Sequence, residues 1–268
     1  MRVAARNRVK GPLMLAPSDP IHNRNRKLQV AILISGRGSN MAALVDAAKE
    51  PEYPAEVVLV VSNRPDAPGL IRAQEADIPT VVVDHTLDGG DRITFEHRLH
   101  QVLKDHDVQF ICLAGFMRLL TPWFIRRWHH RILNIHPALL PAFKGLHTHE
   151  RALQAGVEFH GATVHFVVPK MDSGPILVQV PLRVRENDSP DTLAARVLKI
   201  EHRIYPEALK LVASDRVRIE GKHCTVDGVP IDRRVLFVFG NRRRGILKQH
   251  KAEVLDDSRR VMAPAEIA

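Results

Sequence analysis

The sequence is poor in cysteine, in aromatic residues and in long apolar runs, and each shortage excludes a class of protein. Its two cysteines, Cys112 and Cys224, do not belong to a C-x-x-C pair, so neither a disulfide scaffold nor a zinc ribbon is available. No apolar run approaches the roughly 20 residues of a membrane-spanning helix, which excludes an integral membrane protein. Aromatic residues make up 5% of the 268 residues, and Trp123 and Trp128 do not make a stacking platform for nucleic acid.

Acidic residues are scarce at the two ends of the chain, which explains the net charge of +9. Residues 1–27 hold 7 of the 39 Lys/Arg and 1 of the 30 Asp/Glu, and residues 231–268 hold 9 and 5. The segment 28–230 is left with 23 basic and 24 acidic residues. A nucleic-acid-binding protein is expected to carry its basic surface on the fold itself. The charge therefore argues against nucleic acid as a specific partner.

Both ends are predicted to lie outside the folded domain. Residues 1–27 lack a periodic pattern and indicate a basic disordered leader or a mis-assigned start, with an organellar targeting peptide as the alternative; the apolar stretch at 13–16 is too short for a signal peptide. The basic tail, 231–268, has one apolar run at 235–239, which could add an edge strand or cover a neighbour in a homodimer. We expect residues 28–230 to form the domain and the protein to be cytoplasmic.

Apolar strands alternate with amphipathic helices along the chain. Residues 28–34 form a continuous apolar run, which is typical of a strand buried on both faces. Further strands are predicted at 56–61, 80–83, 108–114, 131–136, 160–168 and 175–183, with a final strand or hairpin within 216–228. Helices are predicted at 39–49, 67–76, 91–105, 148–155 and 189–212, the last capped by Ser189 with Pro190 at its first position. The alternation predicts an α/β fold with a doubly wound, mostly parallel sheet.

A glycine turn, S-G-R-G-S-N at 35–40, follows the first strand and precedes a helix. Free N–H groups at a helix N-terminus bind anions. A dinucleotide fingerprint is opposed by Met41 at the position of the third glycine and by the lack of an acidic residue after the second strand. A single phosphate fits better, and the alternative is a structural turn in which Ser39 caps the helix.

Asn134 and His136 lie two residues apart, so in a strand their side chains project to the same face. They would emerge at a strand end, where open α/β sheets bind ligands. An amide can hold a developing oxyanion, and an imidazole can move protons near neutral pH. Asp172 lies on a tight turn, D-S-G-P, and a carboxylate near an imidazole raises its pKa and orients it. Whether Asp172 reaches His136 is left open by the sequence, as is a purely structural role for the histidine.

A metal site is the alternative reading of the histidine-rich segment. His147 and His149 are spaced as i and i+2, and His160 and His165 could be recruited to reach the three or four ligands that zinc needs. No further spacing matches a known site, so a loop whose histidines bond backbone groups is favoured and no metal is expected.

Six segments in order resemble the folate-dependent phosphoribosylglycinamide formyltransferases. They are I-S-G-R-G-S-N (34–40), L-A-G-F-M-R-L-L (113–120), L-N-I-H-P-A-L-L-P (133–141), G-L-H-T-H (145–149), H-G-A-T-V-H-F-V (160–167) and D-S-G-P-I (172–176). The resemblance covers about residues 28–228. It implies a doubly wound sheet of about seven strands.

The resemblance also implies which residues act. A catalytic set falls on Asn134, His136 and Asp172. The glycinamide ribonucleotide would contact Gly38, Ser39, Asn40, Leu198, Lys199, Ile200 and Glu201. The co-substrate 10-formyltetrahydrofolate would contact Arg92, Met117, Arg118, Leu119, Leu120, Asn134, Val168, Pro169, Lys170, Met171 and Asp172.

The implied reaction moves a formyl group between these two small molecules in purine (IMP) biosynthesis. The nearest alternative is formyltetrahydrofolate hydrolase, which uses similar residues with water as acceptor but carries an extra N-terminal domain. Methionyl-tRNA formyltransferase shares the fold but adds a sizeable C-terminal domain. Each extra domain is larger than the leader 1–27 or the tail 231–268, so we expect neither of these two enzymes.

Overall fold

The strand β1 (Leu28–Ile34) lies in the interior of the main sheet and is buried on both faces. In the computed structural model, which describes residues 26–87 and 89–231, Val30 and Ile32 belong to one apolar cluster and Ala31 and Leu33 to a second. Successive side chains of a strand point to opposite faces, so the two clusters lie on opposite sides of the sheet. The continuous apolar run that predicted this strand reflects that double burial.

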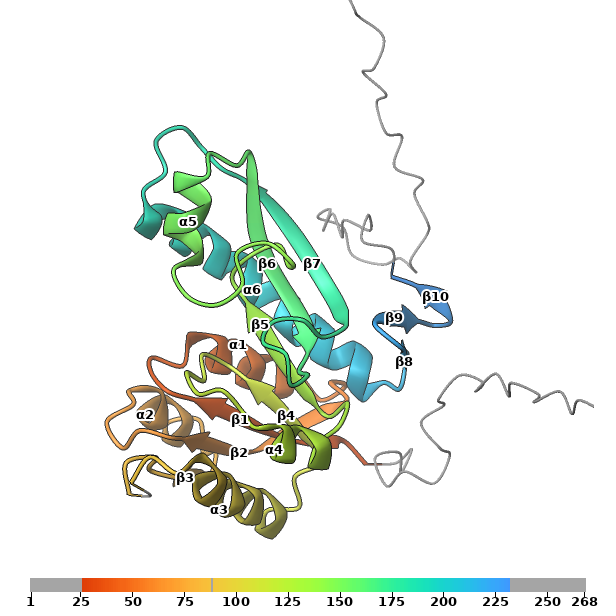
Figure 1. Cartoon of the computed structure of the whole chain (residues 1–268). Coiled ribbons are helices and arrows are strands. Elements are labelled where there is room, and N and C mark those ends of the chain that lie inside the picture. The colour runs from red at the N-terminus through yellow and green to blue at the C-terminus, as the bar shows by residue number, and fades with distance from the viewer. Residues whose placement is uncertain (1–25, 88, 232–268) are drawn as a thin grey trace, which may run out of the picture. The chain divides into compact units, whose positions relative to one another are not determined.

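The described residues form the elements labelled in Figure 1. The other strands of the main sheet are β2 (Ala55–Ser62), β3 (Thr80–Val82), β4 (Phe110–Leu113), β5 (Ile132–His136), β6 (Phe159–Phe166) and β7 (Ile176–Arg183). The helices are α1 (Ser39–Ala48), α2 (Gly69–Gln74), α3 (Arg92–Asp105), α4 (Pro122–Arg127), α5 (Thr148–Gln154) and α6 (Pro190–Ala213). A second, antiparallel sheet follows, made of β8 (Val217–Glu220), β9 (His223–Val226) and β10 (Val229–Pro230).

The main sheet has seven strands in the order β3-β2-β1-β4-β5-β6-β7. The first five are mutually parallel, and β6 and β7 continue the sheet as antiparallel strands. The predicted α/β fold with a mostly parallel sheet is confirmed. Because β1 to β5 run in one direction, their carboxyl ends meet at one edge, and the polar residues that follow them gather there.

Helices cover both faces of this sheet. The first apolar cluster includes Met41 of α1 and Leu193 of α6, and the second includes Phe95 of α3 and Phe124 of α4. The helix α4 was not predicted. Its signal is Pro122 at the first helical position after an extended Thr121, an arrangement that starts helices.

Two predicted helix caps have different outcomes. Ser189 caps α6 as predicted, because its side chain accepts from the Thr192 N–H and Pro190 follows at the first helical position. Ser39 does not cap α1, and that alternative is wrong. Gly38 is the N-cap residue, in the left-handed conformation with φ of 70°, and Ser39 is already helical. No side chain therefore occupies the first N–H groups of α1.

The predictions for the chain ends fall almost entirely outside the described residues. Of the predicted leader only 26 and 27 are described, and of the predicted tail only Ile231; the apolar run at 235–239 is outside. The Ile231 N–H donates to the Cys224 carbonyl (2.9 Å) and its side chain packs against the first apolar cluster. A truncated chain should therefore keep Ile231.

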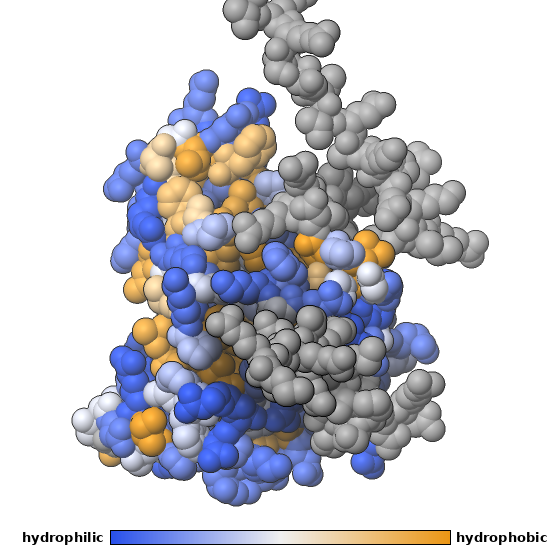
Figure 2. All heavy atoms as spheres, turned by 45° about the vertical axis from the view of Figure 1, so that its right-hand side comes forward, coloured by the Kyte–Doolittle hydropathy of each residue, from blue (hydrophilic) through white to orange (hydrophobic). Residues whose placement is uncertain are grey.

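Hydrophobic and hydrophilic residues alternate over the face shown in Figure 2, where hydrophobic patches are bordered by hydrophilic residues. Exposed apolar side chains are common on protein surfaces, because apolar atoms contribute much of the accessible area. Among residues 26–87 and 89–231, no helix is both long enough and apolar enough to cross a membrane.

The hydroxyl of Tyr205 ties α6 to the middle of the sheet, which gives a first test of the fold. It lies 3.0 Å from the carbonyl oxygen of Leu113 and 3.1 Å from that of Leu133, and burial raises the pKa of Tyr205 well above its usual value. We expect Tyr205→Phe to lower the free energy of unfolding by about 1–3 kcal/mol in urea, since the buried carbonyls lose a donor. Tyr53→Phe, whose hydroxyl donates to one carbonyl, that of Pro206, should cost less; an unchanged midpoint for Tyr205→Phe would contradict the assignment.

Candidate active site

The centre of the site lies at the carboxyl end of β5, where Asn134 and His136 project from alternate positions. The antiparallel register of β6 sets His165 opposite Asn134 and Thr163 opposite His136. His136 is 5% exposed and Asn134 is half-buried. The predicted pair is thus held on a rigid strand and partly shielded from water.

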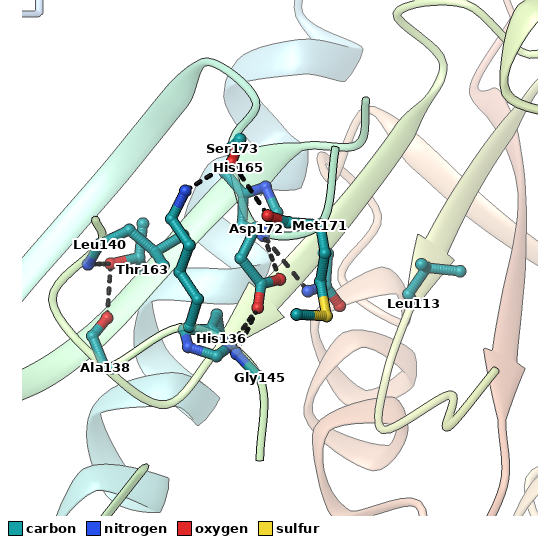
Figure 3. Close-up of polar contacts among 12 residues, drawn as sticks. Leu113, His136, Ala138, Leu140, Gly145, Thr163, His165, Met171, Asp172 and Ser173 are labelled. Atoms are coloured by element: carbon teal, nitrogen blue, oxygen red, sulfur yellow. Dashed lines mark hydrogen bonds and ion pairs between the residues drawn. The ribbon is translucent and has the colours of Figure 1, made fainter. Parts of the chain in front are cut away.

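Asp172 reaches this pair from the turn between β6 and β7, as Figure 3 shows. Its Oδ2 lies 3.6 Å from Nδ1 of His136 and accepts the Gly145 N–H (2.8 Å), while its Oδ1 lies 3.7 Å from Nε2 of His165. Asp172 itself has a positive φ of 47°. The question that the sequence left open is answered, because carboxylate and imidazole are neighbours.

Hydrogen bonds fix the protons of His136. Its Nε2 lies 3.0 Å from the Phe143 carbonyl oxygen, which can only accept, so Nε2 carries a proton. Nδ1 then faces the carboxylate of Asp172.

His165 is a site residue that sequence reasoning considered only as a metal ligand. Its Nδ1 donates to the Phe166 carbonyl (3.0 Å), and its Nε2 lies 3.2 Å from Nδ2 of Asn134. Burial lowers the pKa of His165, so the ring is neutral at pH 7 and Nε2 accepts the Asn134 amide proton. The contact orients the amide of Asn134. Its signal is the strand register, which sequence alone does not supply.

The glycine turn brings Asn40 to Glu201. Gly38 packs closely against Gly69 of α2, because a Cβ added to Gly38 would lie 3.0 Å from Cα of Gly69. The close approach leaves no room for a side chain at position 38. The side-chain amide of Asn40 donates to Glu201 Oε2 at 2.6 Å, across 161 residues of sequence. Glu201 is therefore placed beside the glycine turn, as the resemblance implies for a ribonucleotide site.

The other three predicted residues of α6 directly precede Glu201 and lie on different faces of the helix. At about 100° per residue, Leu198 shares the face of Glu201, whereas Lys199 lies on the far side and is exposed. Ile200 packs against the first apolar cluster. Of the four predicted residues of α6, Glu201 contacts the glycine turn, through Asn40; the roles of Leu198, Lys199 and Ile200 stay predictions.

Burial raises the pKa of Glu201 above its ordinary value of 4.5, with partial compensation by Asn40. A native carboxyl with a raised pKa binds its proton more tightly than the unfolded chain does, so stability falls as pH rises through the native pKa. We expect Glu201→Gln to raise the free energy of unfolding at about pH 8 and to leave it unchanged at about pH 4. Urea unfolding at both pH values measures this, with the exposed Glu207→Gln as control. An equal effect at both pH values would contradict it.

The residues predicted for the folate lie around the same edge. Met117 and Leu119 expose large apolar side chains in the loop after β4, and Arg118 lies over the ring of Phe95 (4.7 Å). Arg92 is the first residue of α3 and is exposed. In the loop 168–172, Met171 is exposed beside Gly145, while Pro169 and Lys170 face solvent. The Met117 loop follows β4, the parallel neighbour of β5, and Asp172 contacts His136 at the end of β5. Leu120 is half-buried against the second apolar cluster.

The histidines of the metal alternative are divided between separate partners. Nδ1 of His147 lies 3.0 Å from Oε2 of Glu150, whereas Nδ1 of His149 lies 3.2 Å from Nε2 of His160. His165 belongs to the Asn134 contact. Within 26–87 and 89–231, no group of three or more His, Cys, Asp or Glu is arranged to hold a metal ion.

This fold and site define a formyl transferase domain. The sequence model of the family described as formyl transferase matches residues 28–209. Phosphoribosylglycinamide formyltransferase of Escherichia coli (strain K12) is 40% identical over 204 residues, which span 75% of this chain and 94% of that protein. The chain belongs to the phosphoribosylglycinamide formyltransferase family.

Other relatives fit this membership. The trifunctional purine biosynthetic protein adenosine-3 of Gallus gallus is 47% identical over 203 residues, which are 75% of this chain and 20% of that protein, so the chain spans about a fifth of its length. The solved phosphoribosylglycinamide formyltransferase of Coxiella burnetii in complex with CHES has a TM-score of 0.74 and 42% identity, covering 78% of this chain and 97% of that one. A formyltetrahydrofolate deformylase from Pseudomonas syringae has a TM-score of 0.70 at 26% identity, covering 75% and 66%.

Proposed function

We propose that this chain transfers a formyl group from 10-formyltetrahydrofolate to the amine of N1-(5-phospho-D-ribosyl)glycinamide, giving the N-formyl product and tetrahydrofolate in purine (IMP) biosynthesis. The observation that supports it most is the contact of Asp172 with His136, 3.6 Å apart, at the same edge of the sheet as a glycine turn that is suited to a phosphate. A cytoplasmic location and a homodimer belong to the same proposal.

The ribonucleotide is held at the start of α1. The main-chain N–H groups at Ser39 and Asn40 have no side-chain cap and would donate to its phosphate. Glu201, which accepts from Asn40, would bind donor groups of the acceptor molecule. The folate would lie against the Met117 loop and the turn of Asp172, so that the formyl carbon comes to the end of β5.

Chemistry then follows from the groups at that strand end. The substrate amine attacks the formyl carbon, the new C–N bond forms, and the carbonyl oxygen becomes a tetrahedral oxyanion. One N–H of Asn134 is engaged by His165, and the other remains free to donate to this oxyanion. His136 in its protonated form would stabilise the oxyanion electrostatically, and Asp172, whose Oδ2 lies 3.6 Å from Nδ1 of His136, orients the imidazole.

The intermediate collapses when the bond from carbon to N10 of the folate breaks. The proton lost by the attacking amine ends on N10, and we propose that Asp172 and water carry it there. No covalent enzyme intermediate is required. Because both substrates are bound at once, proximity supplies a large part of the rate.

One assay with three acceptors tests the proposal. Purified protein is given 10-formyltetrahydrofolate with glycinamide ribonucleotide, with water alone, or with charged initiator tRNA, and tetrahydrofolate release is followed. Turnover only with the ribonucleotide is expected. Equal release without any acceptor would show a hydrolase, and formylation of the tRNA would show that the acceptor is wrong.

A further inference from the structure

A row of polar groups crosses the carboxyl edge of the sheet on the side away from His136. Ser35 follows β1 directly, Asn63 follows β2, and His85 lies three residues beyond β3. These strands lie side by side in the order β3-β2-β1-β4, and the loop after β4 carries Met117. Four neighbouring strand ends thus contribute to one row, which none of the proposed chemical steps uses.

Hydrogen bonds connect the row from end to end. The Met117 N–H donates to Oγ of Ser35 (2.8 Å), and the Ser35 hydroxyl donates to Oδ1 of Asn63 (2.5 Å). Nδ1 of His85 donates to the main-chain oxygen of Asn63 (2.7 Å). In addition, the main-chain N–H of Ser35 donates to the carbonyl of Gly115 (3.1 Å). Ser35 and Asn63 are only 7% and 3% exposed, so water cannot readily replace these bonds.

We infer that Ser35 is a positioning residue for the formyl donor, a role that rests on the proposed function. The loop 115–120 has no regular secondary structure, and Met117 and Leu119 are 67% and 56% exposed. Ser35 holds this loop by two hydrogen bonds. Its main-chain N–H donates to the Gly115 carbonyl, and its hydroxyl oxygen accepts from the Met117 N–H. Ser35 thereby fixes the apolar surface against which the folate would lie.

Loss of the Ser35 hydroxyl should raise the KM for 10-formyltetrahydrofolate and not the KM for the ribonucleotide. Ser35→Ala leaves the Met117 N–H without its acceptor and Asn63 Oδ1 without its donor, and it does not touch the Asn40–Glu201 contact. A buried group left unpaired has a cost that corresponds to about tenfold in binding. We expect the KM for 10-formyltetrahydrofolate to rise about tenfold, with kcat and the KM for the ribonucleotide within about twofold of wild type.

Ser62→Ala is the matched control. Ser62 is fully buried, it ends β2, and its hydroxyl also donates one bond and accepts one, both with the main chain of Arg64 (2.7 and 3.0 Å). It should lose similar thermal stability but keep both KM values. If Ser35→Ala is too unstable to purify, Ser35→Cys, whose thiol bonds more weakly, should give a smaller rise in the same KM.

Calorimetric titration with tetrahydrofolate separates the two proposals. Weaker binding to Ser35→Ala than to Ser62→Ala supports the positioning role even if the acceptor has been misassigned. A second outcome would overturn the role of Ser35 alone. In it the wild-type protein transfers formyl normally, and Ser35→Ala changes both KM values equally or changes neither. Wild-type protein that neither binds tetrahydrofolate nor transfers formyl would overturn both proposals.

Discussion

His136→Ala is expected to lower kcat by on the order of 100-fold or more, because oxyanion stabilisation and proton transfer each contribute on that scale. The imidazole lies 3.6 Å from the carboxylate of Asp172 and is nearly buried, so water cannot take over its charge readily. Both KM values should change much less than kcat, since the glycine turn and the Met117 loop are untouched. Steady-state kinetics with glycinamide ribonucleotide as acceptor measures the effect.

Two further variants show whether the loss is chemical. Asp172→Asn retains an oxygen that can accept the Gly145 N–H but removes the negative charge beside His136, and it should also lower kcat strongly. His160→Ala is the control for burial, because His160 is 0% exposed and contacts His149 instead of Asp172. It should lose stability and keep most of its turnover. A His136→Ala protein with nearly normal kcat would refute the catalytic assignment.

The fold could be predicted because its signals are local. A continuous apolar run marked β1, and Ser189 followed by Pro190 marked the start of α6. The i and i+2 spacing of Asn134 and His136 set both on one side of β5. Each of these depends on residues within a few positions of one another, where strand alternation and capping chemistry leave few alternatives.

The missing parts of the site depend on contacts between distant segments. Asp172 meets His136 only because β6 returns antiparallel beside β5 and its following turn folds back over the strand ends. His165 meets Asn134 through the same register, and a shift of one residue would point it to the other face. The bond from Asn40 to Glu201 joins two helices far apart in sequence. No local pattern encodes such distances.

The failed prediction that Ser39 caps α1 shows the same limit. Serine at the start of a helical pattern is a good cap by propensity, yet Gly38 takes that position in α1. The close approach of Gly38 to Gly69 of α2 decides the turn, and that approach is a tertiary contact. A serine side chain that leaves the N–H groups uncapped is what an anion site needs.

Gly174→Ala is expected to remove most of the turnover and to lower the free energy of unfolding by about 3 kcal/mol or more, a loss typical of severe overpacking. A Cβ at this position would lie 1.8 Å from the carbonyl oxygen of Phe166 and 2.9 Å from its carbonyl carbon. Those atoms belong to the main chain at the end of β6, where the Phe166 N–H also donates to the Pro175 carbonyl (2.9 Å), so no side-chain rotation can relieve the clash. The turn must move, and Asp172 lies two residues before Gly174.

Gly156→Ala separates this effect from the general cost of replacing a glycine. Gly156 has a positive φ of 61°, and nothing lies within 4 Å of an added Cβ, so its replacement meets only the backbone strain of about 1–2 kcal/mol. Urea unfolding should therefore show a larger loss for Gly174→Ala, although Gly174 is not held at a positive φ. Turnover should fall in Gly174→Ala and persist in Gly156→Ala, because only the first displaces the carboxylate from His136. Equal stability and full activity in both variants would mean that the turn can shift without moving Asp172. The close packing of Gly174 against the main chain of Phe166 would then not position the carboxylate.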